Sequence, residues 1–93
     1  MFDRVLRQMR EAIRACQYVM TLHAEEEMSD DGLSVFDIEY GVLTGLIAER
    51  QRDATASEWK YLVRGQTLGG EPIVIVARLG ATGKLVIITV FRA

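Results

Sequence analysis

The chain is poor in the residues that mark several classes of protein. A single cysteine among 93 residues excludes an intramolecular disulfide and is typical of a reducing compartment, so we expect a cytoplasmic protein. No apolar run approaches the ~20 residues of a membrane-spanning helix. The charged start of the chain does not resemble the apolar region of a signal peptide. We therefore expect no membrane association.

The rest of the composition is typical of one small globular domain. Apolar residues make up 49% of the chain and charged residues 26%, which argues against disorder. A chain of this length has room for a single core, so we expect one domain over residues 1–93. The glycines do not form a phosphate-binding motif, and we expect no cofactor.

The net charge of −2 conceals three blocks of different sign. Residues 1–22 hold four arginines and two acids, which gives +2. Residues 23–49 hold eight acids and neither lysine nor arginine, which gives −8. Residues 50–93 hold seven basic and three acidic residues, which gives +4. Such blocks create local fields that the average does not describe, so a basic binding surface in the second half is compatible with the acidic average.

The first half of the chain predicts helices. Their expected ranges are 2–16, 23–31 and 35–44, with a short strand over 18–21. The first helix is amphipathic: its apolar stripe includes Cys16, which we expect to be buried, while Arg7, Arg10 and Arg14 form a solvated face. The third helix should be capped by Ser34, with an acid three residues later.

The second half predicts strands. β-branched and aromatic runs cover 46–50, 59–66, 72–79 and 85–91, and residues 54–58 form the best candidate for a flexible loop. These short connections predict an antiparallel meander. The expected fold is therefore α+β, with N-terminal helices packed on a four-stranded antiparallel meander sheet.

The runs 73–76 and 85–88 are apolar at consecutive positions, which makes both sheet faces apolar. About thirty helical residues can cover one face of such a sheet, so the second face must be covered by another chain or by the N-terminal helix, or be left exposed. Because an exposed apolar face is usually an interaction surface, we expect a protein partner or a homodimer.

Two groups of motifs resemble a known family. They read Thr21-Leu22-His23-Ala24, Met28, Gly32-Leu33-Ser34 and Asp37-Ile38, then Tyr61-Leu62-Val63-Arg64-Gly65, Gly70-Glu71-Pro72-Ile73 and Val86-Ile87-Ile88-Thr89-Val90-Phe91. Over residues 19–92 this pattern resembles the domain of unknown function 4258 family of small prokaryotic proteins. That family looks like part of the RelE/ParE/BrnT toxin-like superfamily. The resemblance implies a RelE-like fold, RNA cleavage or gyrase inhibition by analogy, and an antitoxin-like partner. Two arginines of the family pattern fall here on Glu27 and Asp31, where carboxylates repel phosphate.

His23 is the only histidine, and the ordinary pKa of a histidine suits acid–base catalysis near neutrality. On a helix it shares a face with four acids, Glu26, Glu27, Asp30 and Asp31. Three interpretations are open: a structural histidine on a solvated acidic face, a catalytic or recognition residue, or a divalent-metal site with Glu27 and a third acid. No metal motif such as HExxH is present, so we assign no metal ligands.

The strands carry the remaining candidates. His23, Arg64 and Arg92 are the one trio able to supply the acid–base group and the phosphate clamp of a metal-independent RNase, and we take them as candidate catalytic residues. Candidate binding residues are Lys60, Tyr61, Arg78, Lys84 and Thr89. Trp59, Tyr61 and Phe91 could stack on bases. The alternative is that the basic residues guard sheet edges while Trp59 and Phe91 pack.

Three functions are compatible with these features. The first is a toxin-like, RNA-directed endoribonuclease of a toxin–antitoxin system. The second is a non-catalytic protein–protein interaction module that kept the toxin-like scaffold. The third is a metal-dependent hydrolase at the acidic helix. The expected partners are an antitoxin-like protein or a second copy of the chain, with RNA as a further possibility.

Overall fold

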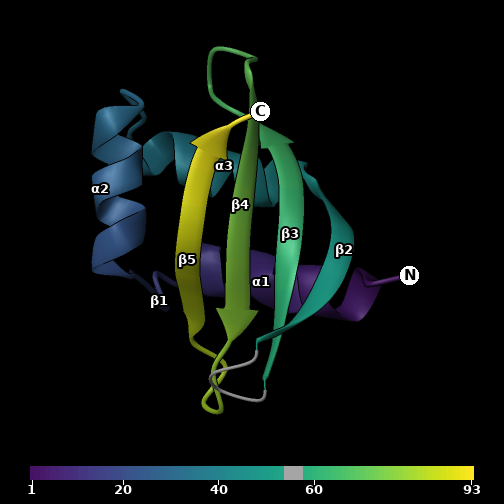
Figure 1. The fold of residues 1–93 in the computed structure, drawn as a ribbon. Coiled ribbons are helices and arrows are strands. Elements are labelled where there is room, and N and C mark those ends of the chain that lie inside the picture. The colour runs from purple at the N-terminus through teal and green to yellow at the C-terminus, as the bar shows by residue number, and fades with distance from the viewer. Residues whose placement is uncertain (54–57) are drawn as a thin grey trace.

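The computed structural model describes residues 1–53 and 58–93 (Figure 1). The described elements are, in chain order, α1 (Asp3–Arg14), β1 (Tyr18–Met20), α2 (Leu22–Asp30), α3 (Val35–Thr44), β2 (Leu46–Asp53), β3 (Glu58–Gln66), β4 (Pro72–Leu79) and β5 (Leu85–Arg92). The fold is α+β, as expected. The expected loop over 54–58 lies outside the described residues, except for its last residue, which begins β3.

The sheet differs from the expected four-stranded antiparallel meander. In the described residues it has five strands in the order β1-β5-β4-β3-β2, and β1 runs parallel to β5. The ladder on β5 continues at both ends of β1: Leu85 N–H donates to the Gln17 carbonyl and Thr21 N–H to the Ile87 carbonyl. The expectation was wrong because β1 joins the sheet beside β5, which is far from it in sequence. The chain between these two strands runs through α2, α3 and β2–β4, and a long connection of this kind permits parallel pairing, which a hairpin turn does not.

The helices lie on one side of the sheet (Figure 1). α1 and α3 cross behind β5, β4 and β3, and α2 stands beside β5. The core lies between these layers and combines side chains of all three helices with alternate residues of the strands, namely Met9, Ala12, Ile13, Ala24, Ile38, Val42, Tyr61, Val63, Ile73, Ile75, Ala77, Leu85, Ile87 and Val90. We call this side of the sheet the helix face.

Two expectations about α1 were wrong. Arg10 is not part of a solvated face, because its guanidinium donates to the carbonyls of Val42 (3.2 Å) and Gly45 (2.7 Å) and so ties α1 to the end of α3. Cys16 is exposed rather than buried. The helix ends at Arg14, and Cys16 follows with φ of +55°, which turns its side chain away from the apolar stripe.

α3 approaches β3 at backbone distance because glycines meet there. A Cβ atom on Gly65 would lie 2.9 Å from Cα of Gly41 and closer still to the Gly41 carbonyl oxygen. A Cβ atom on Gly45 would lie 2.6 Å from the Arg64 carbonyl oxygen. No side chain fits at these points, so the three glycines set how closely α3 packs on the sheet.

Candidate functional site

The side of the sheet opposite the helices is uncovered in the described part of the chain, and we call it the open face (Figure 1). Strand register defines its rows, because residues paired across neighbouring strands point to the same side. One row is Leu46, Arg64, Val74 and Phe91, and the next is Glu49, Leu62, Val76 and Thr89. Beyond them Gln51 pairs with Lys60 and Arg78 with Val86. Six of these side chains are apolar, namely Leu46, Leu62, Val74, Val76, Val86 and Phe91.

The centre of the open face is apolar and packed within the sheet. Val74 is only 2% exposed although no helix lies over it in the described residues. Its row neighbours are Arg64 and Phe91, and long or aromatic side chains paired across strands on one face are close enough to cover a valine between them. Phe91 itself is 39% exposed and Leu46, at the end of the same row, is 70% exposed. A contiguous apolar surface of this kind is typical of an interaction site.

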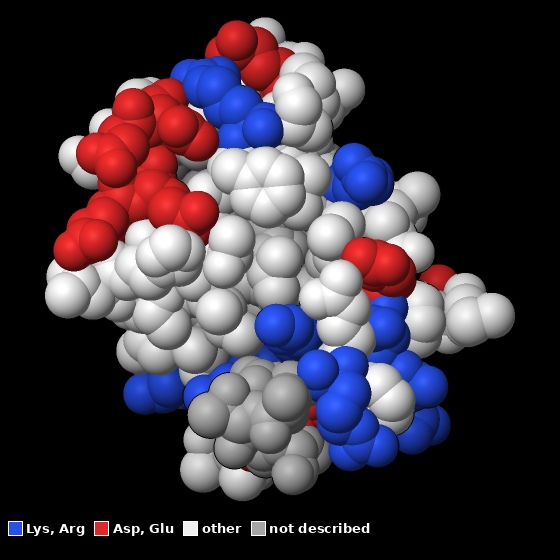
Figure 2. Space-filling view, in the orientation of Figure 1, with Lys and Arg blue, Asp and Glu red and all other residues white. Residues whose placement is uncertain are grey.

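Charges of opposite sign border this apolar centre on opposite sides (Figure 2). Acidic side chains gather over α2 at the upper left, and Lys and Arg gather at the lower end of the strands, with most at the lower right. Lys60 and Arg64 make no hydrogen bond or ion pair within the described residues, whereas Arg78 is paired with Glu58 (Nη1–Oε2 3.1 Å). Lys84 is exposed in the turn between β4 and β5.

His23 lies in the first turn of α2, with 66% of its side chain exposed. Its Nε2 is 3.1 Å from Oε1 of Glu27, one turn further along the helix. The same Oε1 accepts the backbone N–H of Val90 in β5 at 3.1 Å. His23 therefore contacts a carboxylate oxygen that also accepts a hydrogen bond from the edge of β5.

α2 replaces β1 along the second half of the β5 edge. β1 ends at Met20, and from there three side chains of the following segment bond alternate residues of β5. Thr21 Oγ1 donates to the Ile88 carbonyl, Glu27 accepts from Val90 N–H and Asp31 accepts from Arg92 N–H. The two carboxylates at positions where the family pattern has arginine thus act as acceptors that pair an otherwise bare strand edge.

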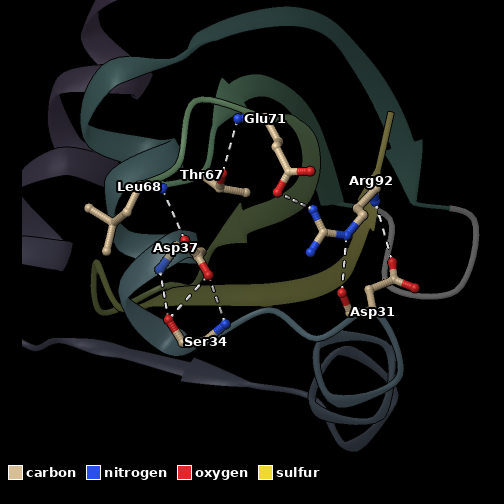
Figure 3. Close-up of polar contacts among 7 residues, drawn as sticks. All are labelled: Asp31, Ser34, Asp37, Thr67, Leu68, Glu71 and Arg92. Atoms are coloured by element: carbon tan, nitrogen blue, oxygen red, sulfur yellow. Dashed lines mark hydrogen bonds and ion pairs between the residues drawn. The ribbon is translucent and has the colours of Figure 1, made fainter.

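Arg92 belongs to a cluster that we call the polar corner, formed by Asp31, Ser34, Asp37, Thr67, Leu68, Glu71 and Arg92 (Figure 3). Its guanidinium donates to the Asp31 carbonyl (3.0 Å) and to Oε1 of Glu71 (2.8 Å). The polar corner joins the ends of α2 and β5 to the start of α3 and to the turn between β3 and β4. Arg92 is therefore held between two acceptors rather than presented to a ligand.

Asp37 holds the other half of the polar corner. Ser34 caps α3 as expected, and Ser34 and Asp37 bond each other reciprocally as a capping box. The second carboxylate oxygen of Asp37 accepts the N–H of Leu68 in the β3–β4 turn at 3.0 Å. These backbone hydrogen bonds, Ser34 first and then Leu68, lower the pKa of Asp37 from its usual 3.8.

The three candidate catalytic residues occupy different parts of the molecule. Arg64 lies on the open face, in the row of Val74. Arg92 pairs with Ile73, whose side chain is in the core, so it belongs to the helix-face row. His23 lies beyond the sheet edge on α2. The structure does not gather these side chains around one point.

The candidate binding residues are divided in the same way. Lys60, Arg78 and Thr89 belong to the open face, but Tyr61 is a core residue that packs edge-to-face on Phe2 at 5.8 Å. Trp59 lies on the helix-face side of β3, since it alternates with Lys60. Its ring is flanked by guanidinium carbons of Arg50 (3.9 Å) and Arg52 (4.2 Å). Among the candidate stacking residues, Phe91 is thus the one displayed on the open face.

Sequence reasoning missed the residues that build the scaffold around these candidates. Glu27 and Asp31 were expected to mark a lost phosphate site, and no sequence signal indicates that they bond a strand edge. The close approach of α3 had a signal, because Gly41 and Gly45 are spaced as a small-residue pair on one helix face. Within residues 1–53 and 58–93, no three His, Cys, Asp or Glu side chains are grouped as a metal site would require.

Comparison with known proteins gives one family match. No helix in the described residues has the length and apolar character to cross a membrane. No curated protein and no solved structure matches the chain. The model of the family described as "Domain of unknown function (DUF4258)" matches residues 20–92, which include every strand except the first two residues of β1. The chain therefore belongs to the domain of unknown function 4258 family.

Proposed function

We propose that this chain is a non-catalytic protein–protein interaction domain, and that its open face is the binding surface. The observation that carries the proposal is the row of Leu46, Arg64, Val74 and Phe91 with its neighbours. It forms an apolar centre bordered by charge, with no helix over it in the described residues. An apolar core with a polar rim is the usual anatomy of a protein interface.

The composition of the open face supports a protein ligand over a phosphate backbone. Its centre is aliphatic at Leu62, Val74 and Val76, and Glu49 lies in the same row as two of them. Arg78 is paired with Glu58, which leaves Lys60 and Arg64 as the cations of this face without a partner in the described residues. The acids of α2 border the face and would repel phosphates.

The contacts of the candidate catalytic residues support the absence of catalysis. Arg92 is engaged by Asp31 and Glu71, and His23 by Glu27. Each of these partners also holds an element in place. Two of the three side chains that such an RNase would need, His23 and Arg92, are thus engaged in contacts within the fold, while Arg64 is unpaired in the described residues.

Photo-crosslinking in cells tests whether the open face contacts another protein molecule. Benzoylphenylalanine at position 89, on the open face, should give covalent adducts with protein. The same residue at position 7, on the exposed side of α1, should give few and serves as the matched control. Adducts of equal yield at both positions, or none at position 89, would contradict the proposal. Mass spectrometry of the adducts identifies the bound protein.

The second candidate function is the toxin-like endoribonuclease, within a RelE-like superfamily. Lys60 and Arg64 favour it, because both are unpaired within the described residues and share the open face with the ring of Phe91. Overexpression should then arrest growth, and His23→Ala should relieve the arrest while Glu26→Ala, an exposed acid on the same helix, should not. Normal growth at high expression, with intact RNA in vitro, would leave the interaction domain as the better account.

A further inference from the structure

Acidic and basic side chains border the open face on opposite sides, so the faces of two copies of the chain are electrostatically complementary. Acidic side chains lie over α2 on one side of the apolar centre, and Lys and Arg gather diagonally opposite (Figure 2). Glu25, Glu26 and Asp30 are exposed on α2. Lys60 lies at the far end of the strands, together with Arg78 and its ion-pair partner Glu58. A two-fold axis lying in this face, along the other diagonal, brings the acids of one copy over the basic side chains of a second copy. The same contact then occurs twice, as an isologous dimer requires.

The size of the molecule also favours an interface on the open face. Its principal extents are 32 × 25 × 24 Å. A stable interface buries about 800 Å² on each partner, which is nearly a whole face of a molecule this small. The helix face is already used to pack α1 and α3, so the open face is the surface of the right extent and apolar content.

We propose that the protein bound by the open face is a second copy of this chain, in a face-to-face dimer. The apolar rows meet at its centre, and α2 of each copy lies against the basic strand ends of the other. This inference rests on the proposed function and names the partner at that surface. The desolvated apolar centre would supply the affinity, and the two charged contacts would fix the orientation.

A charge-swap experiment on the purified full chain tests the orientation. One variant reverses the basic end, Lys60→Glu with Arg78→Glu, and the other reverses the helix, Glu26→Lys with Asp30→Lys. Each variant alone places like charges at both contacts, and its dimer should dissociate about tenfold more readily than wild type. An equimolar mixture restores opposite charges at both contacts, so it should form a heterodimer with an affinity close to that of wild type. Restoration by mixing also shows that both variants are folded.

Sedimentation equilibrium measures these affinities, and Val76→Lys, at the centre of the open face, should leave the chain monomeric. A dimer that persists in Val76→Lys and in both charge variants overturns the inference, because the copies would then meet elsewhere. A wild-type monomer at about 100 μM overturns it as well, since that concentration exceeds the dissociation constant of ordinary dimers.

If position 89 still crosslinks to another protein in that case, the proposed function stands without the dimer. If it crosslinks to nothing, both fail, and retention of RNA by the wild-type chain but not by Lys60→Glu/Arg78→Glu would assign the face to RNA.

Discussion

The two faces of the sheet place very different demands on their side chains, and β4 shows the contrast within one strand. Ile73, Ile75 and Ala77 point into the core and are at most 1% exposed. Val74, Val76 and Arg78 alternate with them on the open face, where Val74 is buried between its row neighbours and the other two stay partly exposed. On the helix face, helices enforce close packing, down to backbone contacts at glycine. On the open face, burial comes from neighbouring strands alone, so its apolar character exceeds what the fold requires and is available for binding.

The sharpest test of close packing on the helix face is Gly65→Val. The new side chain meets the backbone of Gly41, which cannot move aside without displacing α3. We expect a loss of more than about 4 kcal/mol of unfolding free energy, at the extreme for a single substitution. Gly69→Val, in the exposed β3–β4 turn where a Cβ atom meets only Thr67 Oγ1 at 3.7 Å, should change stability little. Urea denaturation of both variants makes the comparison. Equal stability would show that α3 is free to shift.

Alanine substitutions at adjacent positions of β4 compare the faces directly. Ile75→Ala leaves a cavity in the core and should cost about 3 kcal/mol. Val76→Ala removes methyl groups from the partly exposed open face and should cost less than about 1 kcal/mol at protein concentrations where the chain is monomeric. Thermal and urea unfolding measure both values. A similar cost at the two positions would mean that the open face is covered, as a tight dimer would cover it, so the measurement should be repeated at several protein concentrations.

The edge contact of α2 predicts an intermediate effect. Glu27→Ala leaves the backbone N–H of Val90 without its acceptor and should cost about 1–2 kcal/mol. Glu26→Ala, one residue away and exposed, should stay within about 0.5 kcal/mol of wild type. Glu27→Gln keeps a carbonyl acceptor and should recover part of the loss. Identical stabilities for the variants at 26 and 27 would show that water satisfies the β5 edge.

The polar corner predicts a small effect of pH. Because the folded-state pKa of Asp37 lies below its usual 3.8, ionised Asp37 contributes stability above that pH, and this contribution is lost as pH falls through the lowered folded-state pKa. Asp37→Asn should therefore reduce stability at neutral pH and flatten its decline in acid. Melting temperatures of the two proteins between pH 6 and pH 2 check this. If melting temperature falls with pH in parallel for the two proteins, Asp37 does not contribute to the loss of stability in acid.

Parts of this fold were readable in the sequence because local chemistry determines them. The bounds of α3 and β4 were predicted to the residue, since Ser34 and Asp37 make a recognisable cap and a β-branched run defines the strand. The parallel pairing of β1 was not predicted, because three residues carry too little signal to indicate which strand they join.

The candidate site was only partly predictable, and a β-bulge explains why. The register between β4 and β5 shifts between Val76 and Ala77, which inserts Ile88 as an extra residue in β5. Simple alternation from Val86 would place Arg92 on the open face, the same side as Arg64. The bulge moves Arg92 to the helix face instead. Nothing in the sequence marks the bulge. From the residues alone, Arg64 and Arg92 could be proposed to lie on the same face, and only the structure shows that they do not.

The side chains that pair the β5 edge also limit how copies of this chain can polymerise. At one lateral end the outermost strand is β1, three residues long, and Glu27 and Asp31 pair the rest of the β5 edge, while no described element pairs with the outer edge of β2, which has eight residues. Strand addition therefore has one long starting point and one very short one. Two chains joined through β2 would form one continuous sheet whose remaining ends offer only the short β1. Such ends disfavour further growth into a fibre by edge pairing.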